Sequence, residues 1–350
     1  MRSSENRGDH RATTSQPGDG ARAAELHALL ACPACAGALA QEEQGFRCQA
    51  CATAFAAPEG IPALTLDRRR VDTRTERVRA FYGETPFPGY RARDTLYALR
   101  ARAAASPLAR MLDRAIPQDA RVLDLGCGTG QMSLFLAGDQ RLVVGADLTR
   151  ASLALARNAA ARFGVEGALF VETDLRRPGL RPGRFDVVVC LGVLHHTPDP
   201  RAAFASVARL ARPGGLLVIG LYNAVARLPH RLRRLVARLS GMRLFLADPV
   251  LRDRRCEPER RQAWLRDQYL HPEEHRHTLG QVQRWFRAND VDYLRSYPPA
   301  VIGADPLADA DLFTPAEDDW WLEGLVCQLG WTVTLGAEGG LFVTIGRRWQ

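Results

Sequence analysis

Residues 120–130 read Ala-Arg-Val-Leu-Asp-Leu-Gly-Cys-Gly-Thr-Gly, and this stretch decides how the chain folds. The apolar run that begins at Val122 has no polar alternation, which predicts a strand buried on both faces. Three glycines at alternate positions follow, and a glycine loop lets a ligand approach the backbone closely. Residues 131–137 have a helical pattern, so the loop also presents a helix N-terminus to that ligand.

The spacing of the glycines separates two kinds of nucleotide site. A dinucleotide fingerprint needs G-x-G-x-x-G, but here the spacing is G-x-G-x-G, with Asp124 at the strand end. This pattern resembles motif I of the class I methyltransferases that depend on S-adenosylmethionine (SAM). The resemblance suits the ligand, because SAM has no pyrophosphate and a carboxylate can serve its cationic methionine portion.

A second motif strengthens the resemblance. Residues 192–200, Gly-Val-Leu-His-His-Thr-Pro-Asp-Pro, follow an apolar strand at 185–191, and Pro-Gly-Gly at 213–215 leads into another strand. The match therefore covers residues 120–223. It implies an α/β fold with a Rossmann-like, seven-stranded methyltransferase sheet, helices on both faces, and the last strand, 341–345, antiparallel at the edge.

The carboxyl ends of the strands carry the expected cofactor residues. An acidic residue at Asp147 can accept both ribose hydroxyls; the alternative is a helix-capping carboxylate, although Thr149 already suits that cap. In the resembling family, the acid at the position of Asp174 accepts from the adenine amino group. The full expected set is Asp124, Gly126, Cys127, Gly128, Gly130, Asp147, Leu148, Asp174, Leu175, Leu191 and Tyr82.

Two C-x-x-C pairs near the N-terminus predict a metal site. They supply four thiolates, the set that binds tetrahedral zinc, and four cysteines leave no open position, so the zinc would be structural. The alternative is two redox pairs or incidental cysteines. The run through residue 64 resembles the zinc ribbons of small activator subunits that accompany RNA and protein methyltransferases. The expected ligands are Cys32, Cys35, Cys48 and Cys51.

The chain divides into four expected parts. Residues 81–90 mix aromatics with prolines, which predicts a stiff, non-helical strap that either packs on the domain or covers the cofactor. The parts are a disordered tail (1–24), a four-cysteine zinc ribbon (25–66), a linker and cofactor-covering strap (67–90), and a methyltransferase domain (91–350) with a lid insertion (224–277) and an acidic insertion (300–330).

Residues 228–239 place leucines on one helical face and arginines on another. We interpret this helix as a lid over the site, and a basic helix facing a membrane surface or RNA is the alternative. The polar segment 267–277, rich in histidine and glutamate, is either a metal or acid–base site or a polar loop.

Four residues are candidates for catalysis. His195 and His196 follow the fourth strand at the sheet edge where ligands bind in open α/β sheets. His196 is the first candidate for a base, with Tyr222 and His271 behind it. The alternative is that either histidine of the pair only caps the loop.

Composition excludes several classes of function. The Lys+Arg total of 47 is all arginine, so a P-loop and a Tyr-x-x-x-Lys dehydrogenase site are excluded. The formal charge of +8 indicates anionic partners. No apolar run reaches about 18 residues, so no membrane span is predicted. Without the apolar core of a signal peptide, the chain is expected to be cytoplasmic.

Three functions remain open from the sequence. The favoured one is methyl transfer from SAM to a small or medium-sized organic acceptor. The others are an RNA methyltransferase, in which the ribbon and arginines hold tRNA or rRNA, and a non-catalytic SAM-binding module. An oxygen or carbon acceptor needs a base, whereas an amine does not always need one. The sequence leaves the acceptor atom and the oligomeric state undecided.

Overall fold

The computed structural model describes residues 19–66, 73–84, 86–138, 140–245, 248–253, 256–271, 273–304, 311–316, 321–335 and 339–350. Residues 1–18 of the expected disordered tail, 67–72 of the expected linker, and 305–310 and 317–320 of the expected acidic insertion lie outside these residues. Among the described helices, none is both long and apolar enough to cross a membrane.

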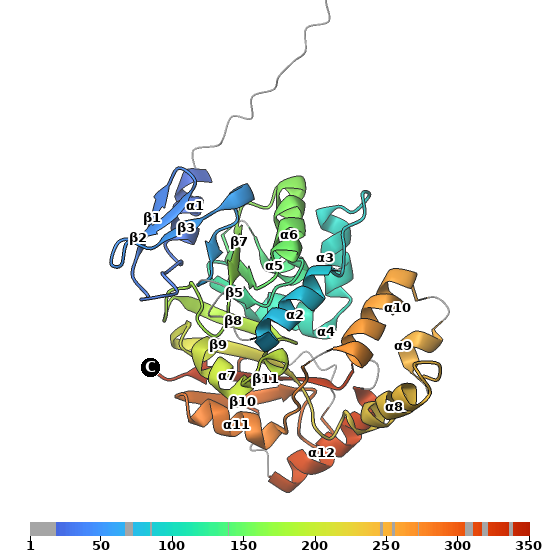
Figure 1. Cartoon of the computed structure of the whole chain (residues 1–350). Coiled ribbons are helices and arrows are strands. Elements are labelled where there is room, and N and C mark those ends of the chain that lie inside the picture. Colours follow the sequence, from blue (N-terminus) through green and yellow to red (C-terminus); the bar gives the residue numbers. More distant parts are fainter. Residues whose placement is uncertain are drawn as a thin grey trace, which may run out of the picture.

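One mixed sheet organises the chain (Figure 1). Only β11 runs antiparallel to its neighbours; the other pairings that the structure shows in this sheet are parallel. From edge to edge the strands are β10 (Val291–Tyr297), β11 (Leu341–Arg348), β9 (Ala211–Tyr222), β8 (Phe185–Leu191), β5 (Arg121–Leu125), β6 (Leu142–Asp147), β7 (Ala168–Thr173) and β4 (Ala63–Leu64).

The expected sheet of seven strands with the last one at the edge is wrong on both points. Within the described residues the sheet has eight strands, and β11 lies between β9 and β10. Phe342 packs in one hydrophobic core and Val343 in the other, so β11 is buried on both faces like a central strand. The eighth strand, β4, comes from the N-terminal part of the chain and pairs with β7.

Helices cover both faces of the sheet and form two cores, because successive strand residues point to opposite faces. Leu123 packs in the core that α7 (Pro200–Ala208), α11 (Leu279–Arg287) and α1 (Asp19–His27) share. Val122 lies in the core on the other face, whose helices are α3 (Leu96–Ala104), α4 (Pro107–Ala115), α5 (Gln131–Leu136) and α6 (Arg150–Phe163). Helices α3 and α4 are separate, because Pro107 starts a new helix with Ser106 as its cap.

The N-terminal module is a three-stranded antiparallel sheet that joins the main sheet through the backbone. Its strands are β1 (Leu39–Glu42), β2 (Gly45–Cys48) and β3 (Ala54–Ala56), followed by the turn η1 (Pro58–Gly60). Ala31 N–H donates to the Gly179 carbonyl at 3.0 Å, and Arg181 N–H donates to the Leu29 carbonyl at 2.8 Å. With β4 on β7, these bonds fix the module at one edge of the sheet.

The remaining elements lie around the carboxyl edge of the sheet. They are α2 (Thr73–Glu84), η3 (Leu194–His196), α8 (Leu228–Leu239), α9 (Pro249–Arg252), α10 (Pro258–Leu265), the π-helical segment η4 (Arg266–Leu270) and α12 (Trp321–Thr334). The expectation that 81–90 is non-helical is wrong for 81–84, because the first proline of the segment is Pro86 and the helix ends before it. The expected acidic insertion also contains α12, an apolar helix.

Candidate functional site

A cavity of about 340 Å³ opens at the carboxyl ends of β5, β6, β7 and β8. Helix α2 roofs it through Thr75, Val78, Arg79 and Tyr82, and the segment 86–88 closes one side. Most of the residues that the sequence assigned to the cofactor line it: Gly126, Cys127, Gly128, Asp147, Leu148, Asp174, Leu175, Leu191 and Tyr82, together with His196.

Two assigned residues do not line this cavity, Asp124 and Gly130. Asp124 accepts a 2.6 Å hydrogen bond from the Ser133 hydroxyl, and burial raises its pKa to about 6. Gly130 has φ +78°, and a Cβ there would lie 2.6 Å from the Ala156 Cβ and 2.8 Å from the Phe170 ring. Both residues hold the shape of the glycine loop and stand behind the cavity wall.

Asp147 braces the glycine loop while lining the cavity. Its carboxylate accepts hydrogen bonds from Gly128 N–H at 2.9 Å and from Thr149 N–H at 2.7 Å. Burial raises its pKa, and these backbone donors oppose the shift. Thr149 stands at the N-cap of α6, but its side chain makes no capping bond. A carboxylate has about four acceptor positions, so two remain for a ligand.

The roof is tied to the sheet by charges that the sequence reading missed. Arg79 of α2 binds the Glu172 carboxylate, which Arg150 also binds at 3.1 Å. The sequence feature that could have revealed these ion pairs is Glu172, a glutamate in a mostly apolar strand. Asp174 is already paired with Arg176 at 2.7 Å, so its expected bond to an adenine amino group would have to share the carboxylate.

His196 is the one catalytic candidate of the four that lines the cavity. Its Nδ1 lies 2.7 Å from the Glu273 carbonyl, to which it donates, so Nε2 carries the lone pair. That Nε2 is 4.0 Å from a carboxylate oxygen of Asp267. Burial lowers the pKa of His196, and Asp267 acts in the opposite direction. The ring is therefore neutral near pH 7 and can accept a proton.

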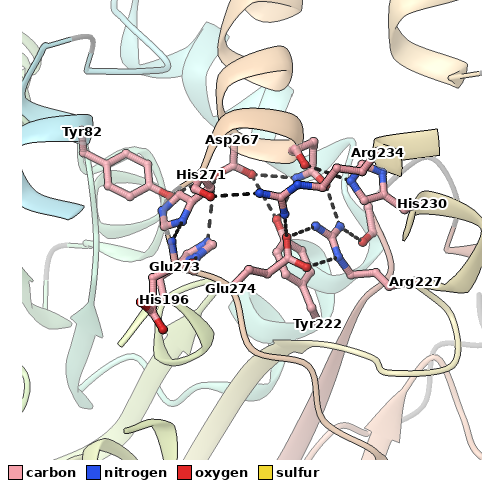
Figure 2. Close-up of polar contacts among 12 residues, drawn as sticks. Tyr82, His196, Tyr222, Arg227, His230, Arg234, Asp267, His271, Glu273 and Glu274 are labelled. Carbon is pink, nitrogen blue, oxygen red and sulfur yellow. Dashed lines mark hydrogen bonds and ion pairs between the residues drawn. The ribbon is translucent and has the colours of Figure 1, made fainter. Parts of the chain in front are cut away.

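Asp267 joins two phenols beside His196, as Figure 2 shows. Tyr82 and Tyr222 donate to its two oxygens at 2.9 and 3.1 Å. Burial alone would raise the pKa of Asp267, but the two neighbouring histidines and the phenols bring it below its usual value. The sequence reading passed over Asp267, because nothing local separates it from the other acids of its polar segment.

His195, Tyr222 and His271 lie behind the cavity. The His195 ring is fully buried, with neither nitrogen hydrogen-bonded among the described residues, and it packs on Tyr222. Tyr222 is held by Asp267 and by Gln268, whose amide donates to its oxygen at 2.7 Å. His271 stacks on His196 with ring centroids 3.7 Å apart. These three residues support His196 and do not reach the cavity.

His196, Asp267 and His271 lie close enough to suggest a metal site, with possible ligand atoms within 4.8 Å of one another. The hydrogen bonds argue against it. His271 Nδ1 accepts from Glu273 N–H at 3.1 Å, so in the neutral ring Nε2 carries the hydrogen and has no lone pair to offer. Both Asp267 oxygens also accept phenol hydrogens, so the arrangement fits an acid–base site better than a metal.

The four cysteines of the N-terminal module form a second candidate site. All four Sγ atoms lie within 4.8 Å of one another, with Cys32–Cys51 at 3.6 Å and Cys35–Cys48 at 3.5 Å. These separations suit zinc, whose bonds of about 2.3 Å place tetrahedral thiolates about 3.8 Å apart. The residues after the two knuckles, Ala36 and Ala52, both have φ +59°, the conformation for which ribbons use glycine.

Residues 123–219 match the family described as a methyltransferase domain. An uncharacterized protein of Synechococcus sp. is 30% identical over 257 residues, 64% of this chain and 60% of that protein. The ubiquinone biosynthesis O-methyltransferase of Cronobacter sakazakii is 36% identical over 107 residues, 31% of this chain and 44% of that enzyme. The chain thus spans less than two thirds of either relative.

Among solved structures, the magnesium protoporphyrin IX methyltransferase of Synechocystis PCC 6803 with bound SAM is 16% identical. The similarity covers 81% of this chain and 100% of that one, with a TM-score of 0.43.

Proposed function

We propose that this chain is a SAM-dependent methyltransferase, which the match of residues 123–219 to a methyltransferase domain supports, and that it methylates a hydroxyl of a small organic molecule. One observation carries the proposal. The same cavity is lined by the glycine loop and Asp147 and also by His196, with its Nε2 lone pair. The residues proposed to bind the cofactor and the residue proposed to act on the acceptor therefore line one cavity.

The cavity residues suit SAM. Asp147 keeps acceptor positions for the ribose hydroxyls, and Gly128, with φ +54° and no atom within 4 Å of an added Cβ, leaves open space beside the loop. Leu148, Leu175 and Leu191 supply apolar walls for an adenine ring. Asp124, behind the loop, holds Ser133 at the start of α5 and so fixes the backbone that faces the methionine portion.

Bound SAM supplies a methyl group on a positively charged sulfur. The chain then has to align an acceptor oxygen with that methyl and take its proton. His196 Nε2 is placed to accept this proton, and the Glu273 carbonyl keeps the ring in the required tautomer. Once His196 is charged, the carboxylate of Asp267 stabilises it from 4.0 Å.

A small acceptor is favoured over RNA. The cavity has aromatic and apolar walls, including Tyr82 and Phe87. Two arginines of the basic stripe, Arg227 at the start of α8 and Arg234 within it, are bound to Glu274 at 2.6 and 3.1 Å and are not free to bind RNA phosphates. A hydroxyl acceptor agrees with the neutral base and with the activity named for the O-methyltransferase relatives. The base also favours an enzyme over a non-catalytic SAM-binding module.

We also propose that the four cysteines bind one structural zinc ion, so that residues 25–66 act as a zinc ribbon similar to the methyltransferase-activator subunits. The sulfur separations support this. The ribbon would stabilise the enzyme in cis, because its chain adds β4 to the sheet beside Glu172, which holds the roof helix through Arg79.

The acceptor class is tested by incubating the purified chain with methyl-labelled SAM and a cell lysate. We expect label in the organic-soluble small-molecule fraction, and mass spectrometry then identifies the product and the methylated atom. Label confined to tRNA or rRNA would replace the proposal with RNA methylation.

Asp147→Ala is expected to weaken SAM binding by about 5- to 150-fold, roughly 1–3 kcal/mol, because the ribose hydroxyls lose their acceptor. Isothermal titration calorimetry measures the affinity, and circular dichroism checks that the substitution has not unfolded the domain. Asp119→Ala, in an exposed turn before β5, is the matched control. Unchanged SAM affinity combined with tight binding of NAD would overturn the assignment.

A further inference from the structure

Helix α8 turns its leucines toward solvent, the opposite of what its pattern predicts. Leu232 is 60% exposed and Leu239 is 80% exposed, and Leu228 and Leu235 on the same face are also exposed. None of the residues that line the cavity comes from the described part of 224–277, and the expected lid over the cofactor stays a prediction.

Polar contacts on the inner face of α8 fix this orientation. Arg227 is fully buried and binds Glu274 and the Gln268 amide oxygen, the latter at 2.6 Å. His230 lies 2.9 Å from the Gln268 carbonyl, and Arg234 donates to the His271 carbonyl at 3.0 Å (Figure 2). Rotating the helix to bury its leucines would break all of these contacts and leave the buried guanidinium of Arg227 without an ion-pair partner.

A second helix presents apolar side chains in the same region. On α12, Leu329 is 54% exposed and Val333 is 83% exposed, with Leu325 and Val326 beside them. The side chain of Asn223, which lies between β9 and α8, donates to Gln328 of α12 at 2.9 Å, so α12 is bound to the segment that leads into α8. We define the α8–α12 apolar surface as Leu228, Leu232, Leu235, Leu239, Leu325, Val326, Leu329 and Val333.

The charges around the leucines of α8 are of one sign. Helix α8 has four arginines and no acidic residue, and two of them, Arg231 and Arg238, are exposed beside the leucines. Arg243 follows just after the helix and is also exposed. Exposed leucines flanked by arginines are typical of helices that lie in the interface of an anionic membrane. A second copy of the chain would instead bring like charges to the leucines of α8.

We propose that the α8–α12 apolar surface docks the protein on an anionic lipid membrane. The leucines insert between the headgroups, and Arg231, Arg238 and Arg243 contact the lipid phosphates. This attachment is peripheral and reversible, and it is a property of the folded chain that does not depend on methyl transfer.

Flotation of the full chain with vesicles tests this proposal. We expect it to float with vesicles of phosphatidylcholine mixed with phosphatidylglycerol and much less with phosphatidylcholine alone. The double substitution Leu232→Ser/Leu239→Ser should weaken binding by about tenfold or more, because two inserted side chains are lost. Arg231→Gln and Arg238→Gln should each weaken it by about fivefold, with the loss vanishing at high salt.

Tyr97→Ser is the matched control, because Tyr97 is 83% exposed on α3, away from α8 in Figure 1, and should bind like the wild type. No binding to the mixed vesicles, or binding that survives the leucine substitutions, would overturn the proposal. The proposal would also be overturned if sedimentation showed a dimer that the leucine substitutions dissociate and if the chain did not bind vesicles.

Discussion

His196→Ala is expected to lower kcat by about 10²–10⁴-fold while leaving the SAM affinity within a few fold of the wild type. The reason is geometric. His196 is the cavity residue whose Nε2 lone pair is fixed by a hydrogen bond on its other nitrogen, from Nδ1 to the Glu273 carbonyl. The measurement is single-turnover methyl transfer to the acceptor identified with labelled SAM. Added imidazole should restore part of the rate, which it would not do for a residue that only shapes the cavity.

The pH profile gives an independent check. Burial lowers the pKa of His196 below its usual value of 6.5, so the base is neutral at pH 7 and becomes charged only as the pH falls through that lowered pKa. We therefore expect the acid limb of kcat/KM to lie below the usual histidine pKa of about 6.5, with full activity above pH 7. Asp267→Asn should move this acid limb to lower pH, because the carboxylate is the largest influence that raises the pKa of His196.

Two outcomes would contradict the role of His196. One is full activity of His196→Ala, and the other is a loss of rate that comes entirely from weaker SAM binding. His27→Gln, in the N-terminal helix and far from the cavity in sequence and in its contacts with Phe46, serves as the control and should keep the wild-type rate and profile.

The central strands were predictable because the local sequence alone indicates that they are buried. An uninterrupted apolar run such as 142–146 or 187–191 has no solvent face, and the glycine turn after β5 needs positive φ angles that only glycine adopts readily. The caps of α7 and α11 were equally local, since Asp199 and Thr278 bond backbone groups three residues away. These features required no knowledge of what lies across the sheet.

The errors concern long-range pairing and orientation. Nothing within residues 341–345 says that β11 inserts between β9 and β10, and two residues are too few for β4 to be predicted as a strand. For α8, the sequence separated a leucine face from an arginine face but did not show that the leucine face is exposed to solvent. The apolar face of a helix is usually the buried one, but here Glu274 binds Arg227 and keeps the arginine face inside. Glu274 lies 47 residues beyond Arg227 in the chain, so only the structure shows that the two are partners.

Removing zinc is expected to unfold the N-terminal ribbon and leave the rest of the chain folded. Structural zinc held by four thiolates contributes about 10–16 kcal/mol of apparent binding free energy at pH 7, and a module with three strands of four residues or fewer has little core to replace it. Elemental analysis should find one zinc per chain. Cys48→Ser should abolish zinc binding, since the Cys48 side chain is 2% exposed and its Sγ lies 3.5 Å from that of Cys35 within the cluster.

Hydrogen exchange will show how far the unfolding caused by zinc removal extends into the chain. Without zinc, the Glu172 amide should exchange faster, because it donates to the Pro62 carbonyl at the junction of ribbon and sheet. Amides of β5 and β8, in the centre of the sheet, should keep their protection. Cys256→Ser removes a thiol outside the cluster and should change neither the zinc content nor the exchange pattern.

Because the Sγ atoms of Cys35 and Cys48 are 3.5 Å apart, against about 2.05 Å in a disulfide, a reductant should have no effect on the ribbon, whereas a chelator should unfold it. A chain that binds no stoichiometric zinc yet keeps its ribbon protected would show that packing alone holds the module.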